Sequence, residues 1–163
     1  MEIITIHKDH FPEIAEIYRH GLEMGNATFE TSIPKWEDWD KGKLKHSRLA
    51  AVINNIVVGW AALSAVSDRC VYGGVAEVSI YISNAHQGKG IGKALMLKLI
   101  EESERNGIWT LQSGMFPENE ATVALHKSAD FRIIGYREKI GKLGNTWRDT
   151  IMMERRSKTI GIN

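Results

Sequence analysis

Three glycines, Gly88, Gly90 and Gly92, alternate with other residues in the stretch QGKGIGK. Glycine at this density is unfavourable inside a strand or a helix, so the stretch is expected to turn the chain between two elements. At a helix start, unpaired N–H groups and the helix dipole attract anions, and glycines let phosphate oxygens approach the backbone. The residue types therefore predict a phosphate site, with a connector that binds nothing as the alternative.

The spacing of these glycines excludes two common phosphate loops. A Walker loop needs G-x-x-x-x-G-K-[ST], and no such string occurs in the chain. A dinucleotide fingerprint needs G-x-G-x-x-G, but Lys93 stands where the third glycine would be. A different kind of anion site is required.

Two side chains near this loop could move protons. In the predicted strand 75–82, alternation puts Glu77, Ser79 and Tyr81 on one face. A carboxylate in an otherwise apolar strand costs free energy unless it is paired or useful, so Glu77 is the candidate general base, or else a surface carboxylate. His126, with an ordinary pKa of ~6.5, could take or give a proton at neutral pH, or could be a packed, hydrogen-bonded histidine.

The elements that would position these residues alternate helices with strands in the second half of the chain. Asn54 and Asn55 predict a tight hairpin turn between two early strands. The pattern indicates an α/β or α+β fold in which helices pack on a sheet of mixed strand direction. The predicted strands are 3–7, 48–53, 56–63, 75–82, 109–115, 131–140 and 146–154, and the predicted helices are 12–22, 35–46, 90–106 and 118–129.

Composition suggests one domain over residues 1–163 in a chain with 21 basic and 20 acidic residues. This balance argues against a dedicated nucleic-acid binder. Cys70 is the only cysteine, so no zinc cluster or other metal site is expected. The N-terminus lacks the pattern of a signal peptide and no apolar run approaches 18 residues, so we expect a cytoplasmic protein without a membrane partner.

The string Gln87-x-x-Gly90-x-Gly92 resembles the acetyl-coenzyme A loop, Gln/Arg-x-x-Gly-x-Gly/Ala, of the GCN5-related N-acetyltransferase (GNAT) family. The order of elements is similar to that fold over nearly the whole chain. Four segments resemble one branch, the phosphinothricin and methionine sulfoximine acetyltransferases: 29–31, 77–82, 119–126 and, more loosely, 145–149.

The resemblance implies a mostly antiparallel central sheet flanked by helices, with the coenzyme loop between the fourth strand and the next helix. It implies acetyl-coenzyme A as co-substrate, held partly by Gln87. By the same resemblance, Asn119 bonds the coenzyme, and strand 75–82 pairs with the pantetheine arm. The backbone groups implied in binding are those of Ile80, Tyr81, Ile82, Gly88, Lys89, Gly90, Ile91, Gly92 and Lys93.

The acceptor pocket is implied to include Phe29, Glu30 and Thr31, with a simple turn as the alternative for this segment. The loop 67–74 is expected to complete the pocket, and Arg69 could clamp a substrate carboxylate, although Arg48 and Arg148 could serve too.

Two positions depart from the wider family. His126 stands where many members of the family have a tyrosine that protonates the leaving thiolate. A histidine at this position is usual in the phosphinothricin branch. Asp130 replaces a usual glycine, and is expected to tolerate the same turn through positive φ.

The function implied is transfer of an acetyl group from acetyl-coenzyme A to the amine of a small amino-acid-like acceptor. Direct attack in a ternary complex is expected, because nothing near Cys70 in sequence would activate its thiol. The alternatives are an acetyltransferase of protein N-termini or ribosomal proteins, and a non-catalytic coenzyme A-binding sensor. A homodimer is expected because it is common among relatives.

Overall fold

A computed structural model of the protein describes all residues, 1–163, and contains one seven-stranded sheet in the order β1-β2-β3-β4-β5-β7-β6. All neighbouring strands are antiparallel except β4 and β5, which are parallel. The mixed, mostly antiparallel sheet is the fold expected from the sequence. The strands are β1 (Glu2–Thr5), β2 (Leu49–Ile53), β3 (Ile56–Ala65), β4 (Val75–Ile82), β5 (Thr110–Met115), β6 (Arg132–Leu143) and β7 (Thr146–Arg156).

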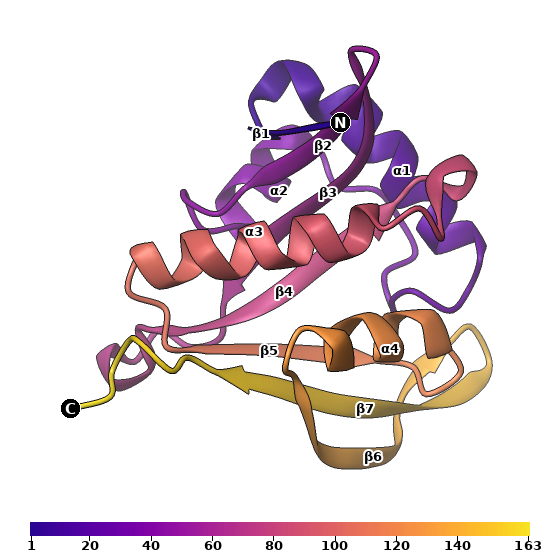
Figure 1. The fold of residues 1–163 in the computed structure, drawn as a ribbon. Helices are drawn as coiled ribbons and strands as arrows, with labels where there is room; N and C mark the ends of the chain where they lie inside the picture. The colour runs from indigo at the N-terminus through magenta and orange to yellow at the C-terminus, as the bar shows by residue number, and fades with distance from the viewer.

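Helices cover both faces of this sheet (Figure 1). On one face, α3 (Ile91–Arg105) and α4 (Glu120–Ser128) enclose the larger core, which includes Leu95, Leu99 and Met153. On the other face, α1 (Phe11–Glu23) and α2 (Trp36–Gly42) enclose a smaller core around Trp39 and Trp60. None of the helices is long and apolar enough to cross a membrane.

Strands β4 and β5 diverge along their length, which Figure 1 shows as a V that opens toward the start of α3. They pair only over Val75–Glu77 and Thr110–Gln112. On its other side β4 stays paired with β3 up to Ile82. The end of β4 therefore has backbone groups on its β5 side without a neighbouring strand.

The register of β4 shows which backbone groups face this gap. The amide of Ser83 donates to the carbonyl of Val58 at 2.9 Å, and hydrogen-bonded pairs alternate along an antiparallel ladder. Tyr81 therefore pairs through its backbone with Trp60, its register partner in β3. Ile80 and Ile82 direct their amide and carbonyl groups into the gap.

Several turns have the backbone that the sequence predicts. Asn54 and Asn55 have φ of 51° and 63°, as a tight hairpin turn requires, and Asp130 has φ of 65°. The predicted helix 35–46 is too long, since α2 ends at Gly42. The reason is tertiary: the Leu44 amide donates to the carbonyl of Leu63 in β3 at 2.8 Å.

The C-terminal hairpin also differs from the expectation in one detail. Strand β6 runs to Leu143, three residues beyond the predicted end of strand 131–140, so the turn before β7 is only Gly144 and Asn145. An irregular register between Arg137 and Gly141, with Lys139 at φ of 47°, lets the long strand continue.

Candidate active site

The glycine loop lies at the start of α3, where Gly90 is the N-cap. Gly88 and Gly90 have φ of 72° and 79°, and a Cβ at either position would meet no atom within 4 Å. Both therefore combine a backbone that favours glycine with open space in front of it. Gly92 differs, because its Cβ would lie 3.3 Å from Leu125 Cδ2, so it permits close packing of α3 on α4.

A first cavity of about 850 Å³ opens in front of this loop and runs along the gap between β4 and β5. Its walls are the outer part of β4, the start of α3, the end of β5 and the start of α4. A helix N-terminus at one end and unpaired strand backbone along the side suit a ligand with a phosphate group and an extended amide-bearing arm. The cavity therefore fits acetyl-coenzyme A.

Two polar side chains of the loop segment are held by the protein itself. Gln87 lines the first cavity and donates through Nε2 to Asn84 Oδ1 at 3.2 Å. Lys89 Nζ folds back to the carbonyl of Ala85 at 2.9 Å. Only the backbone of Lys89 is thus placed for the predicted contact with the coenzyme.

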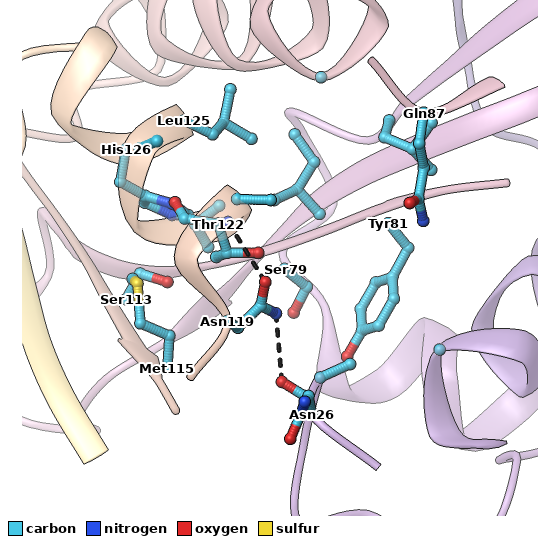
Figure 2. Close-up of a pocket in the computed structure, with 18 of the residues that line it drawn as sticks. Asn26, Ser79, Tyr81, Gln87, Ser113, Met115, Asn119, Thr122, Leu125 and His126 are labelled. Atoms are coloured by element: carbon cyan, nitrogen blue, oxygen red, sulfur yellow. Dashed lines mark hydrogen bonds between the residues drawn. The ribbon is translucent and has the colours of Figure 1, made fainter. Parts of the chain in front are cut away.

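Asn119 caps α4 on the opposite wall of the first cavity. Its Oδ1 accepts the Thr122 amide at 3.3 Å, and its Nδ2 donates to the Asn26 carbonyl at 3.1 Å (Figure 2). Asn119 therefore fixes both the start of α4 and the loop that follows α1, while it also faces the cavity.

His126 lies about two turns further along α4 than Asn119 and is only 1% exposed. Its Nδ1 lies 2.8 Å from the Thr122 carbonyl, and since a carbonyl only accepts, Nδ1 carries the proton. Nε2 has no partner in the protein. Burial lowers the pKa of His126, with the bond to Thr122 acting in the opposite direction. The ring is thus neutral at neutral pH, with Nε2 as an acceptor and not a donor.

A second cavity of about 420 Å³ lies against β3 and β4 on the α1 and α2 side of the sheet. It shares Thr28, Glu77, Ser79 and Tyr81 with the first cavity. Glu77 is exposed at this junction, where its Oε2 accepts from Gln112 Nε2 at 3.3 Å. The candidate base thus stands where β4 and β5 part and where the two cavities meet.

Aromatic side chains form the inner wall of the second cavity. The Tyr81 ring stacks on Trp60 with centroids 5.0 Å apart and meets Tyr18 edge-on at 4.9 Å. Gly21 in α1 permits this arrangement, since a Cβ there would lie 2.9 Å from the Tyr81 ring. Burial raises the pKa of Tyr81, so its phenol stays protonated at neutral pH.

One cation, Lys43, lines the second cavity. Its Nζ donates to Ser79 Oγ at 2.8 Å and to Ser64 Oγ at 3.1 Å. Burial lowers the pKa of Lys43, while the carboxylates of Glu77 and Glu30 act in the opposite direction.

The residues predicted to bind the acceptor are not all brought together. Glu30 lines the second cavity, but Thr31 lines neither cavity. Phe29 packs edge-on against Phe116, with centroids 4.9 Å apart. Arg69 is exposed and lies over the Tyr72 ring at 5.5 Å, away from both cavities.

Sequence reasoning missed three residues at the junction or beside it. Ser79 could have been found, because strand alternation already places it with Glu77 on one face. Thr28 directly precedes the predicted substrate segment. Lys43 has no sequence signal, because it reaches the site only through the fold.

The chain belongs to the acetyltransferase (GNAT) family, whose sequence profile matches residues 11–131. It is 27% identical over 146 residues to the L-methionine sulfoximine/L-methionine sulfone acetyltransferase of Salmonella typhimurium, covering 86% of this chain and 85% of that protein.

Two solved structures share the fold closely. A GNAT superfamily phosphinothricin acetyltransferase from Sinorhizobium meliloti, in complex with AcCoA, has a TM-score of 0.89 and 27% identity, covering 99% of this chain and 91% of that one. A ribosomal-protein-alanine N-acetyltransferase from Brucella melitensis has a TM-score of 0.90 and 25% identity, covering 96% and 100%.

Proposed function

We propose that the protein is an acetyl-coenzyme A-dependent N-acetyltransferase that acts on the amine of a small amino-acid-like acceptor, of the phosphinothricin or methionine sulfoximine type. The observation that carries the proposal is the meeting of the two cavities at Glu77. One cavity suits the coenzyme, and the other is small enough for an amino acid. The similarity to acetyltransferases of such acceptors supports the choice of substrate class.

The first cavity holds the coenzyme, which supplies the acetyl group as a thioester. Backbone N–H groups of the loop 88–93 bind the pyrophosphate, helped by the α3 dipole. Ile80 and Ile82 pair with the pantetheine arm as an added strand would, and Asn119 contacts the coenzyme from α4. These groups place the thioester at the point where β4 leaves β5.

Glu77 receives, through a water molecule, the proton that the acceptor ammonium must lose. The free amine then attacks the thioester carbonyl directly, the C–S bond breaks, and the leaving thiolate of coenzyme A takes the second proton, which the nitrogen gives up as the amide forms. Cys70 is exposed and lines neither cavity, so no covalent carrier is involved. His126 is neutral in the wall of the first cavity, where its Nε2 accepts a hydrogen bond from the bound ligand. Phe29, Thr31 and Arg69 remain predicted acceptor contacts, although none of them lines either cavity.

Thiol release from acetyl-coenzyme A against a panel of amines tests this function. The panel should contain L-methionine sulfoximine, phosphinothricin, the common amino acids and short peptides with an N-terminal alanine. We expect turnover of free amino acids or their analogues and little turnover of peptides. If no small amine is acetylated, the proposed function is wrong.

An acetyltransferase of ribosomal protein N-termini is the second candidate, because one close structural neighbour carries that activity in its name. Turnover of alanyl peptides alone would favour this candidate. Tight binding of acetyl-coenzyme A without any thiol release would instead favour a non-catalytic sensor.

The enzyme is further proposed to work as a homodimer in the cytoplasm, without nucleic-acid or membrane partners. The net charge of +1 supports the absence of a nucleic-acid partner. Edge strand β6 exposes Ile133, Ile134, Tyr136 and Ile140, a surface suited to a second copy. Light scattering during gel filtration gives the mass that checks the dimer.

A further inference from the structure

We propose that Lys43 binds the carboxylate of the acceptor and thereby makes the second cavity selective for amines that carry a carboxylate next to the amine. The inference rests on the proposed function and names the residue that sets its substrate class. It concerns a side chain that no feature of the sequence connects with the reaction.

Lys43 is held in place by several backbone contacts around it. Its own amide donates to Trp39 at the end of α2, and the next amide, of Leu44, donates to Leu63 in β3. The Arg48 guanidinium donates to the Lys43 carbonyl at 2.9 Å. The chain therefore turns rigidly onto the sheet, and the Lys43 side chain is directed across β3 toward β4.

The ammonium group of Lys43 ends between two serine hydroxyls and not against a carboxylate. Its two contacts are the hydroxyl oxygens of Ser64 and Ser79, and no carboxylate lies within 4 Å of Nζ. An ammonium has three donors, so one remains for a ligand. Each serine accepts from Lys43 and keeps its own hydroxyl hydrogen to donate. This set of donors suits an anionic oxygen.

The remaining charges in the second cavity suit the other half of a zwitterion. Glu30, Asp38 and Glu77 line the cavity with Lys43. An α-amino acid can place its ammonium toward these carboxylates, with Glu77 at the junction, and its carboxylate toward Lys43. An amine without a carboxylate leaves the Lys43 ammonium without an anionic partner, and this missing ion pair is what disfavours it.

The three arginines considered for the same task are engaged elsewhere. Arg48 is ion-paired with Asp40 at 2.5 Å and is 7% exposed. Arg148 binds Glu118 and the Gly25 carbonyl, and Arg69 lies over Tyr72. Lys43 is left as the cation that faces the second cavity.

The experiment compares Lys43→Met with Lys41→Met in the full-length protein. Lys41 is exposed in the last turn of α2, two residues before Lys43, and lines neither cavity, so its replacement removes the same charge without touching the site. The two acceptors are L-methionine sulfoximine and its α-carboxamide. Steady-state kinetics give kcat and KM for each, and calorimetry on the coenzyme A-saturated protein gives the Kd of each.

For Lys43→Met we expect kcat/KM for the amino acid to fall about 100-fold, chiefly through KM, as the loss of one partner of a buried charge pair predicts. The kcat/KM for the carboxamide should change less than about threefold, so the variant no longer discriminates between the amino acid and its carboxamide. The KM of acetyl-coenzyme A should stay the same, and Lys41→Met should match the wild type throughout. Lys43→Arg should recover part of the preference.

Equal losses for the amino acid and the carboxamide would show a structural role and overturn the proposal, as would unchanged kinetics. Calorimetry separates this failure from failure of the proposed function. If the wild type acetylates neither acceptor, the proposed function fails for this substrate class. The role of Lys43 then stands only if the wild type binds the amino acid more tightly than the carboxamide and Lys43→Met does not.

Discussion

The first cavity offers a ligand backbone groups along the glycine loop and the free edge of β4, whereas the second offers side chains. At the first, positive-φ glycines at the start of α3 and the unpaired edge of β4 present amide groups. At the second, Lys43 comes from the end of α2, Ser64 from β3 and Glu77 from β4. The phosphate end of a ligand in the first cavity meets one continuous stretch, residues 87–93, although β5 and α4 form the facing wall. A ligand in the second cavity meets only segments that lie far apart in sequence.

This difference explains why the two ligands differ in how readily they can be predicted. A phosphate site needs particular backbone conformations, and glycine marks these in the sequence itself. An acceptor site needs charges and hydroxyls at set distances, and many combinations of segments can supply them. A sequence motif therefore predicts the coenzyme, whereas the acceptor must be inferred from the folded site.

Glu77→Gln should have the largest effect on activity, because Glu77 lies where the two cavities meet and takes the proton that the acceptor amine loses. We expect kcat/KM to fall by about 10²–10³ with little change in coenzyme affinity. The loss should be greatest at low pH and shrink as pH approaches the pKa of the acceptor amine, which then loses its proton unaided. Rates of thiol release measured across pH check this, and a loss that is the same at every pH would remove Glu77 from the role of base.

Gly90→Ala should act on the first cavity alone. The new Cβ enters the space reserved for the coenzyme, and we expect coenzyme affinity to fall about 10- to 100-fold. Gly107→Ala is the matched control, because Gly107 has φ of 80° and equally open space but lies outside both cavities. Calorimetry with coenzyme A should separate the two, and an equal effect of both would mean that strain and not contact is responsible.

Asn119→Ala tests the link between α4 and the loop that reaches the second cavity through Thr28. Loss of the helix cap should lower the free energy of unfolding by about 1 kcal/mol. Asn119→Asp keeps an oxygen for the Thr122 amide but loses the donor to the Asn26 carbonyl. Thermal unfolding should therefore show a lower Tm for Asn119→Ala and little change for Asn119→Asp. An equal fall in Tm for both variants would mean that the bond to the Asn26 carbonyl, and not the helix cap, provides the stability.

His126→Gln should give the smallest effect, a change in how stability depends on pH. The unfolded histidine titrates near ~6.5, and burial lowers its pKa in the folded protein. Below ~6.5 the unfolded chain therefore binds a proton that the folded chain does not, so stability falls as pH falls. Urea unfolding between about pH 7 and pH 5 should show a shallower decline for the variant. A steeper decline would mean that His126 is charged in the fold.

Much of the fold could be predicted because local patterns agree with the final structure. The period-2 alternation of strand β4, the hairpin at Asn54 and Asn55, and the glycine start of α3 are all local signals. The end of α2 was misplaced because a long-range bond between Leu44 and Leu63 ends the helix. Nothing in residues 43–46 indicates that partner.

The candidate site shows the same division. The loop 87–93 and the face bearing Glu77 follow from spacing, and the structure places both at the first cavity. Arg69 is a predicted carboxylate clamp because of its charge and its loop, and in the structure it lies over Tyr72 and lines neither cavity. Charge alone does not say where a long side chain ends, because the path of its backbone decides this.

The kind of fold and the anion loop follow from local sequence patterns, because periodicity and glycine spacing act over a few residues. Long-range packing alone makes β4 and β5 diverge after Glu77 and directs Lys43 across the sheet to Ser64 and Ser79. It also decided that His126 is buried with its Nδ1 proton on the Thr122 carbonyl. These features depend on contacts between distant segments, whose distances are set by packing and not by any local pattern.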